Sequence, residues 1–264
     1  MSLCLQMLRA GLIVVAVLFS WPARAAPSSA AILVYHRFGP QVADSMTTRT
    51  EVFVAQLAAL RRAGYTIVPL ATVVDGLAGR VPLPPRAVAI TVDDGHRTVY
   101  TDLLPIIRRE HLPITLFIYP SAISSASYAM NWAQLQELLA TGSVHVQSHT
   151  WWHPDFRVER RRLDAEAYRQ FVRQQLDKPR QVLQSRLGVK ADYLAWPFGI
   201  HDAGLEAAAK AAGYQAAFIL DERHATSRDS PLALPRYLIV DGRGVSGLIH
   251  SLQAGERSAN GAQP

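Results

Sequence analysis

Short apolar segments alternate with longer amphipathic segments along most of the chain. Runs rich in Val, Ile and Tyr predict buried strands at residues 31–35, 65–68, 87–92, 114–118, 144–147, 193–196, 215–219 and 237–240. Helical spacing of apolar residues predicts helices between them, at 51–63, 100–110, 132–140, 165–187 and 204–212. This alternation indicates an α/β fold, and its length suits a (β/α) barrel of seven or eight units in a single domain.

The first 25 residues differ from the rest. Arg9 precedes an apolar run at 10–19, and the small-residue triplet Ala23, Arg24, Ala25 follows. This pattern predicts a secretory signal peptide over 1–25 and export to the periplasm or extracellular envelope. The apolar run is shorter than the roughly 20 residues that span a bilayer, so we expect no stable membrane span after cleavage. An uncleaved membrane anchor is the alternative.

Composition narrows the classes of function. The single cysteine, Cys4, lies in the predicted signal, which excludes a thiolate zinc site or a cysteine nucleophile in the mature chain. The formal charge of +6 falls to about +4 once Arg9 and Arg24 are removed. No basic patch with interleaved aromatic residues is present, so nucleic acid is not an expected partner. The oligomeric state is left open.

Acidic and histidine residues follow two of the predicted strands. Asp93, Asp94 and Gly95 come directly after strand 87–92, where such a triplet alone is commonly a turn. His149 and His153 follow strand 144–147, and in a helical turn their spacing would place both rings on one face. Because strand ends converge in a barrel, one Asp and two His can hold a metal ion with a position open for water. The other Asp is then available as general base.

Segments 91–95 and 149–153 resemble the first two motifs of the polysaccharide deacetylase family, the NodB-homology group or family 4 carbohydrate esterases. The resemblance covers about residues 31–240, and we assign the domain to 26–253. It implies a distorted (β/α) barrel with Asp93 as catalytic base. It also implies a divalent metal ion, expected to be Zn²⁺, held by Asp94, His149 and His153.

The third motif of that family departs from its pattern here. An arginine that orients the base precedes the proline and aromatic residue in the family, whereas residues 195–199 read Ala-Trp-Pro-Phe-Gly. Arg236 is a candidate substitute, and a surface ion pair is its alternative role. Segments 195–199 and 33–36 resemble the branch that acts on exported poly-N-acetylglucosamine.

The fifth motif, Leu-x-His, supplies the general acid in the family. Residues 248–250 fit it, which makes His250 the candidate acid, although 245–252 also has the pattern of an amphipathic helix. His36, at the end of the first strand, is the next candidate. We expect residues 254–264 to be a disordered tail.

Aromatic and neighbouring side chains are candidates for the walls of a sugar-binding site, with core packing as the alternative. We assign substrate binding to Tyr35, Trp152, Trp196, Pro197, Phe198 and Arg236.

The resemblance implies a hydrolase that removes N-acetyl groups from a polysaccharide containing N-acetylglucosamine. An O-acetyl esterase, a peptidoglycan deacetylase and a catalytically degenerate polysaccharide-binding protein remain alternatives. An unrelated metal-dependent amidohydrolase barrel would carry His-x-His after its first strand, where this chain has Tyr35, His36 and Arg37.

Overall fold

The structure is a computed structural model that describes residues 29–261. The predicted signal peptide, 1–25, lies outside the described residues. Between residues 29 and 261 no helix combines the length and the apolar character needed to cross a membrane.

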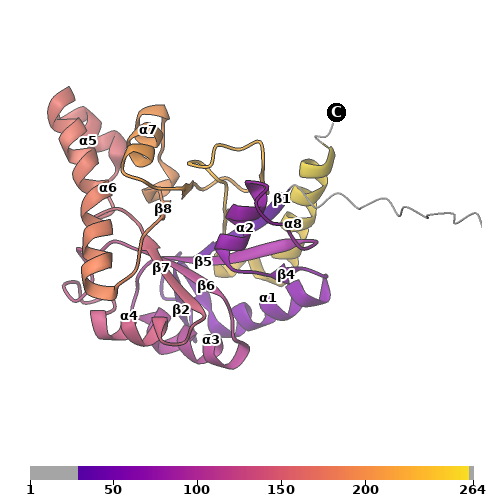
Figure 1. Cartoon of the computed structure of the whole chain (residues 1–264). Coiled ribbons are helices and arrows are strands. Elements are labelled where there is room, and N and C mark those ends of the chain that lie inside the picture. The colour runs from indigo at the N-terminus through magenta and orange to yellow at the C-terminus, as the bar shows by residue number, and fades with distance from the viewer. Residues whose placement is uncertain (1–28, 262–264) are drawn as a thin grey trace, which may run out of the picture.

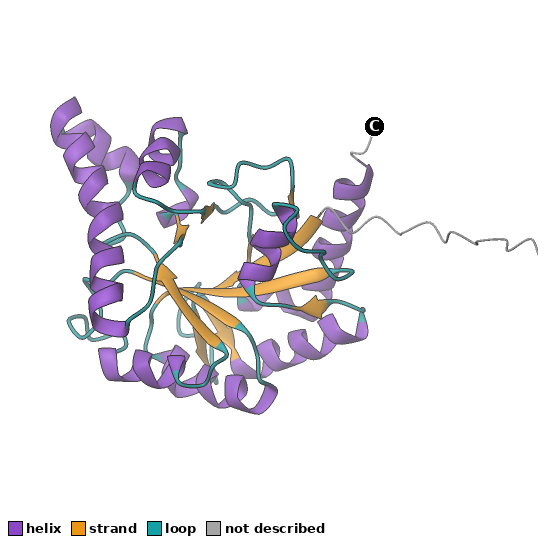
Figure 2. Cartoon of the chain, in the orientation of Figure 1, coloured by secondary structure: helices purple, strands orange, loops and turns teal. Residues whose placement is uncertain are grey.

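A curled, mainly parallel sheet forms the centre of the molecule (Figure 2). The strands run in the order β10-β1-β5-β6-β7-β8-β9, with β4 added beside β5 and β11 beside β1. Only the pairing of β1 with β10 is antiparallel in this sheet. The strands are β1 Ser29–Tyr35, β4 Thr66–Ile67, β5 Ala87–Asp94, β6 Ile114–Ile118, β7 Val144–Ser148, β8 Tyr193–Ala195, β9 Ala216–Phe218, β10 Ala225–Thr226 and β11 Tyr237–Leu238. A separate parallel pair consists of β2 Arg37–Gly39 and β3 Thr47–Arg49.

Residues 234–239, here called the closing segment, connect the two sides of the curled sheet. Leu234 bridges Phe218 of β9. Three residues later, β11 pairs in parallel with β1, with Leu33 opposite Tyr237. The amide of Ile239 donates to the carbonyl of Val34 at 2.9 Å. The sheet therefore closes into a distorted barrel, as the strand and helix alternation predicts.

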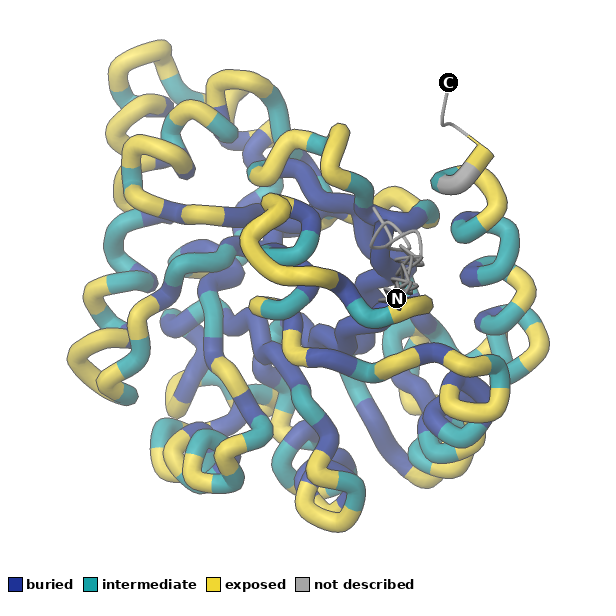
Figure 3. Tube along the Cα trace, turned by 45° about the vertical axis from the view of Figure 1, so that its right-hand side comes forward, coloured by how far each residue is buried: buried dark blue, intermediate teal, exposed yellow. Residues whose placement is uncertain are grey.

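Helices surround the barrel in an arc, with α6 on one side, α4, α3 and α1 below and α8 on the other side in Figure 1. The helices are α1 Thr50–Arg62, α2 Leu70–Leu77, α3 Leu104–Glu110, α4 Trp132–Leu139, α5 Phe156–Arg162, α6 Ala165–Leu187, α7 Ala203–Ala211 and α8 Gly244–Gly261. A π-helical turn, Val99–Leu103, leads into α3. The strands and the inward sides of the helices are buried, whereas exposure concentrates on outer helix faces and loops (Figure 3).

The two faces of the strands have different partners. In β5, Val88, Ile90 and Val92 belong to the core under the outer helices, because alternate side chains point to the same face. Ala89 shares a second apolar cluster, inside the barrel, with Phe117 of β6 and residues of α2. Asp93 follows Ala89 by four residues in β5 and therefore lies on the same inner face. The apolar interior of the barrel thus ends at a buried carboxylate.

The structure agrees with most predicted elements and differs at the end of the chain. Strand 114–118 and helix 165–187 lie where predicted. The prediction of a disordered tail over 254–264 is wrong for residues 254–261, because α8 continues to Gly261, and residues 262–264 lie outside the described residues. Gly255 is buried against Tyr237 and His224, and Glu256 pairs with Arg86 at 3.1 Å, so these contacts hold the last turns of the helix.

Candidate active site

Asp93 and Asp94 are adjacent at the end of β5 but point in different directions. Asp93 is 1% exposed and faces the barrel interior. Asp94 has φ 75°, a left-handed conformation that ends the strand geometry, and its side chain is partly exposed. Gly95 follows with φ 77°, and a Cβ there would press on Ile118 and Ile123, so this turn requires glycine.

Asp94 meets two histidine rings. Its Oδ1 lies 3.6 Å from Nε2 of His149 and 3.8 Å from Nε2 of His153. One ligand atom from each of the three residues lies within 4.8 Å of the others. Four-coordinate zinc with bonds of about 2.0 to 2.2 Å has ligand atoms roughly 3.3 to 3.6 Å apart. The two distances to Asp94 are within a few tenths of an ångström of these values, so the three residues fit a divalent metal ion after a small rearrangement.

The prediction that a helical turn brings the two histidines together is wrong, although their rings do lie side by side. Residues 149–153 form a loop in which Thr150 and His153 have φ of 66° and 63°. The Oγ1 of Thr150 accepts a hydrogen bond from the amide of His153 at 3.1 Å. The ring centroids of His149 and His153 lie 4.6 Å apart as a result.

The nitrogen atoms of both histidines are available to a metal ion. Nδ1 of His149 donates to the carbonyl of Ala195 at 2.8 Å, which leaves the Nε2 lone pair directed at Asp94. Burial, followed by the nearby His149, lowers the pKa of His153 to about 4. His153 is therefore neutral at pH 7, the form that binds metal ions.

Arg236 contacts Asp93 from the closing segment. Its Nη1 donates to Oδ1 and its Nη2 to Oδ2, and Nη1 also reaches Oγ1 of Thr91 at 3.2 Å. The guanidinium carbon also lies 5.4 Å from the ring centroid of Phe117 and 6.0 Å from that of Phe218. Burial raises the pKa of Asp93, but Arg236 and then His149 lower it, so the net pKa is below the ordinary value. Arg236 is fully buried, which corrects its assignment as a substrate contact.

The two candidate acids differ in position. His36 follows β1, and the charges of Asp93 and Asp94 act on its ring, although burial dominates and lowers its pKa. Its Nδ1 is buried without a hydrogen-bond partner among the described residues. His250 is exposed on α8, and within residues 29–261 it makes no hydrogen bond or ion pair with the other candidate residues. The structure thus brings His36, and not His250, to the carboxylates.

The aromatic candidates separate into core and surface residues. Tyr35 and Trp196 are fully buried, which corrects their assignment to a sugar-binding wall. The hydroxyl of Tyr35 donates to Gln56, and Nε1 of Trp196 donates to the carbonyl of Leu232, both at 2.9 Å. Pro197 is also buried.

Phe198 and Trp152 have exposed rings, at 60% and 42%. The Phe198 ring stands edge-on to His153 with centroids 4.6 Å apart. Its φ is 57°, and Gly199 beside it has φ 69° with Leu220 where a Cβ would be. This turn directs an aromatic ring outward beside the predicted metal ligands.

Two tyrosines near the site were absent from the predictions. The Tyr119 ring lies 6.3 Å from that of His149 and 5.4 Å from that of His153, and its hydroxyl bonds to that of Tyr128. A signal for Tyr119 existed, because it follows strand 114–118, between the two strands that end in the Asp and His motifs. No comparable signal marks Tyr128, which is brought in by a loop.

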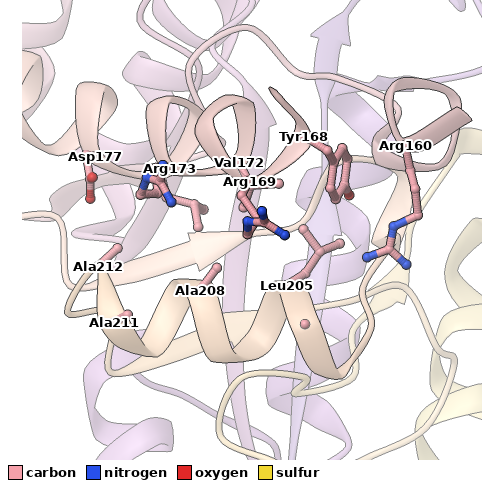
Figure 4. A pocket seen from close by; sticks show the side chains of 12 residues that line it. Arg160, Tyr168, Arg169, Val172, Arg173, Asp177, Leu205, Ala208, Ala211 and Ala212 are labelled. Atoms are coloured by element: carbon pink, nitrogen blue, oxygen red, sulfur yellow. The ribbon is translucent and has the colours of Figure 1, made fainter. Parts of the chain in front are cut away.

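A groove of about 460 Å³ lies between α6 and α7 (Figure 4). Val172, Leu205 and Ala208 give it an apolar floor, and Arg160, Arg169 and Arg173 stand at its rim. None of the predicted site residues lines it, so the groove is a feature apart from the Asp and His cluster.

Comparison with known proteins gives consistent matches. Among relatives, the chain is 26% identical over 244 residues to the poly-beta-1,6-N-acetyl-D-glucosamine N-deacetylase of Escherichia coli (strain K12), covering 78% of this chain and 36% of that protein. It is 25% identical over 160 residues to the protein so named in Staphylococcus epidermidis, covering 59% of this chain and 55% of the other. The chain thus spans about a third to a half of the length of these relatives.

Solved structures share the fold. A Streptococcus pyogenes deacetylase, PplD in complex with acetate, superposes with a TM-score of 0.75 at 18% identity, over 86% of this chain and 99% of that one. IcaB from Ammonifex degensii superposes with a TM-score of 0.72 at 24% identity, over 86% and 98%. The model of the polysaccharide deacetylase family matches residues 80–217, more than half of the sequence. The chain therefore belongs to the polysaccharide deacetylase family.

Proposed function

We propose that this protein is a metal-dependent hydrolase that removes N-acetyl groups from a polysaccharide containing N-acetylglucosamine. One observation carries the proposal. The three-residue metal cluster of Asp94, His149 and His153 lies beside a buried carboxylate, Asp93, whose Oδ2 is 3.8 Å from Nε2 of His149. A metal site beside an ionised base can activate a water molecule and polarise a carbonyl group, as the metal-assisted hydrolysis of an acetamide needs.

We assign the metal ligands to Asp94, His149 and His153, and expect Zn²⁺ because its usual donors are imidazole and carboxylate. When bound there, the ion would supply Lewis-acid polarisation of the acetyl carbonyl and a lower pKa for water. The hydrogen bond from His149 to Ala195 fixes that ring in the orientation that ligation needs.

Asp93 takes the proton of the attacking water in this proposal. The two hydrogen bonds from Arg236 keep the carboxylate ionised and fix its plane. They also occupy one lone pair on each oxygen, so the remaining lone pairs define the direction from which the proton arrives.

His36 is our candidate for the acid that protonates the departing amine. Its buried, unpartnered Nδ1 and the neighbouring carboxylates support this role, and the exposure of His250 argues against the other candidate. An amine needs a proton to leave, so this step is essential for amides and less so for activated esters.

The substrate assignment rests on chemistry and on the relatives' names. The exposed rings of Phe198 and Trp152 suit the apolar face of a sugar, and relatives are named as poly-β-1,6-N-acetylglucosamine deacetylases. We propose that the protein acts after export, in the periplasm or envelope, as the pattern of residues 1–25 predicts.

The decisive experiment measures acetate release from three substrates: β-1,6-linked N-acetylglucosamine oligomers, peptidoglycan and acetylated xylan. We expect release from the oligomers, its loss on chelation and its return on adding Zn²⁺. Preferred hydrolysis of xylan acetate would instead make the protein an O-acetyl esterase. Binding of oligomers without release from any substrate would make it a degenerate binding protein.

A further inference from the structure

Tyr119 lies beside both histidine rings of the metal cluster, with centroids 6.3 Å from that of His149 and 5.4 Å from that of His153. It follows β6, the strand between β5, which ends in Asp94, and β7, which precedes His149. Phe117 faces the barrel interior against Phe218, with ring centroids 5.4 Å apart. Because strand side chains alternate, Tyr119 belongs to the same inner face, one layer nearer the opening.

Its hydroxyl forms a pair with a second, exposed hydroxyl. The Oη atoms of Tyr119 and Tyr128 lie 2.7 Å apart, and Tyr128 is 40% exposed. One O–H is used between the two phenols, so the pair keeps one proton to donate and lone pairs that accept. The ring of His96 lies nearly parallel to that of Tyr128, with an interplanar angle of 9° and ring centroids 6.3 Å apart.

The loop that carries Tyr128 is tied to the turn that carries the acids. The amide of Met130 donates to the carbonyl of Gly95 at 3.0 Å, and the amide of Arg97 donates to the carbonyl of Tyr128 at 2.8 Å. His96 and Ala129 form a further β-bridge. The hydroxyl pair is therefore held in a fixed relation to Asp94, as a preorganised binding group must be.

The metal cluster is bounded by two walls of opposite character. The ring centroid of His153 lies 4.6 Å from that of Phe198 and 5.4 Å from that of Tyr119. The first neighbour is apolar, and the second carries one hydroxyl of the pair. A pyranose ring has apolar C–H faces and a rim of hydroxyls. Such a ring matches a site with one aromatic wall and one hydroxyl wall.

We propose that the Tyr119–Tyr128 hydroxyl pair binds a ring hydroxyl of the sugar that carries the acetyl group, with Phe198 against its C–H face. This proposal rests on the proposed function for its substrate. It makes Tyr119 and Tyr128 substrate-binding residues that distinguish a saccharide from a simple acetyl ester. They take no part in the proton transfers.

The test compares Tyr128→Phe and Tyr119→Phe with a matched control, Tyr100→Phe. The control loses a hydroxyl that donates to Glu137 on α4, outside the site. A single neutral hydrogen bond is worth about 0.5 to 1.5 kcal/mol, so we expect KM for a β-1,6-linked N-acetylglucosamine pentamer to rise roughly 3- to 10-fold in Tyr128→Phe, with kcat within about twofold. The ratio of kcat/KM on the pentamer to that on 4-nitrophenyl acetate should fall by the same factor, and bound metal should be unchanged.

Binding is also measured without turnover, by calorimetry with the pentamer on the metal-loaded Asp93→Asn protein. We expect Kd to rise roughly 3- to 10-fold when Tyr128→Phe is added and to stay constant when Tyr100→Phe is added. Equal Kd values in both, no binding in the parent, or metal loss in Tyr128→Phe would overturn the proposal. If Tyr128→Phe raises Kd but the wild-type protein releases no acetate, only the proposed deacetylase activity is contradicted.

Discussion

The guanidinium of Arg236 holds the carboxylate of Asp93 by two parallel hydrogen bonds, both 2.8 Å long, in the barrel interior. Both side chains are almost fully buried, at 0% and 2% exposed. Removing one partner of such a pair leaves a buried charge and costs about 3 to 5 kcal/mol. We therefore expect Arg236→Met to lower the free energy of unfolding by about that amount, measured by urea denaturation.

The same variant should shift the pH dependence of catalysis. Burial raises the pKa of Asp93, and Arg236 is the strongest influence that lowers it. Removing the arginine should therefore raise the pKa of this carboxyl group. The acidic limb of the kcat/KM profile should move to higher pH. The double variant Asp93→Asn/Arg236→Met should regain most of the stability and none of the activity. An unchanged acidic limb in Arg236→Met would contradict the assignment of Asp93 as base.

The adjacent acids should separate metal binding from catalysis. Asp93→Asn should retain the metal and lose on the order of 100- to 10,000-fold in rate, because it removes the base alone. Asp94→Asn should lose metal, because its carboxylate lies among the ligand atoms. Elemental analysis after dialysis measures the difference, and equal metal loss in both variants would refute the division of roles.

The two candidate acids can be distinguished by substrate. His36→Ala should lose on the order of 100-fold or more on an N-acetylglucosamine oligomer while largely keeping its rate on an aryl acetate, whose leaving group needs less protonation. His250→Ala is the matched control, because His250 is exposed on the outer face of α8, and it should leave both rates near wild type. A selective loss on the oligomer in His250→Ala would restore it as the acid.

His224 has no part in the proposed reaction, but its burial predicts that the free energy of unfolding falls at acid pH. Burial lowers the pKa of His224 to about 4, and its Nδ1 lies 2.8 Å from the hydroxyl of Tyr237. Between the unfolded pKa of about 6.5 and the folded value, only the unfolded chain binds the proton. Stability should therefore fall by up to about 3 kcal/mol as pH drops through this range. His224→Gln should remove that part of the slope, and exposed His145→Gln should not, in denaturation series at pH 7.5 and 5.

The docking of α8 can be tested at two of its glycines. In Gly255→Ala the new methyl group would overlap Tyr237 and His224, and overpacking of this kind typically costs about 1 to 3 kcal/mol. In Gly247→Ala the methyl meets only Arg243 at 3.4 Å, and the gain in helix propensity is up to about 1 kcal/mol. Opposite shifts in Tm are expected. A neutral Gly255→Ala would mean that the end of α8 is undocked in solution.

Local sequence pattern was sufficient for the parts of the site that lie at strand ends. The acidic pair and His149 each follow a predicted strand, and parallel strands of one barrel open at the same end, so the pattern predicts that they converge. Which of the two acids meets the histidines came from the family resemblance, and the structure places Asp94 there. His153 was also identified, although for a wrong geometric reason, because the pattern does not reveal that Thr150 and His153 adopt left-handed backbone conformations.

The contact between Arg236 and Asp93 was expected only in part. The family resemblance made Arg236 a candidate for the missing arginine that orients the base, but a surface ion pair remained open as its role. The two residues are 143 positions apart, and the closing of the barrel brings them into the buried contact that the structure shows. Burial was equally hidden: Tyr35 and Trp196 are residue types that often line sugar-binding sites, but Tyr35 at the end of β1 and Trp196 just after β8 both lie in the core. The composition of residues 254–261 likewise gave no sign of the packing of Gly255 against Tyr237.

The segment that closes the barrel is also the one that carries Arg236, so a local opening of the barrel and the release of Asp93 are a single event. If residues 234–239 detach from β1 or β9, the guanidinium leaves with them while the three metal ligands, on β5 and the loop after β7, keep their places. We expect warming to produce a form that keeps the metal ion and the sheet but has lost the arginine that orients its base. Amide exchange at Ile239, which donates to β1, should rise at the temperature where activity declines and below that of global unfolding.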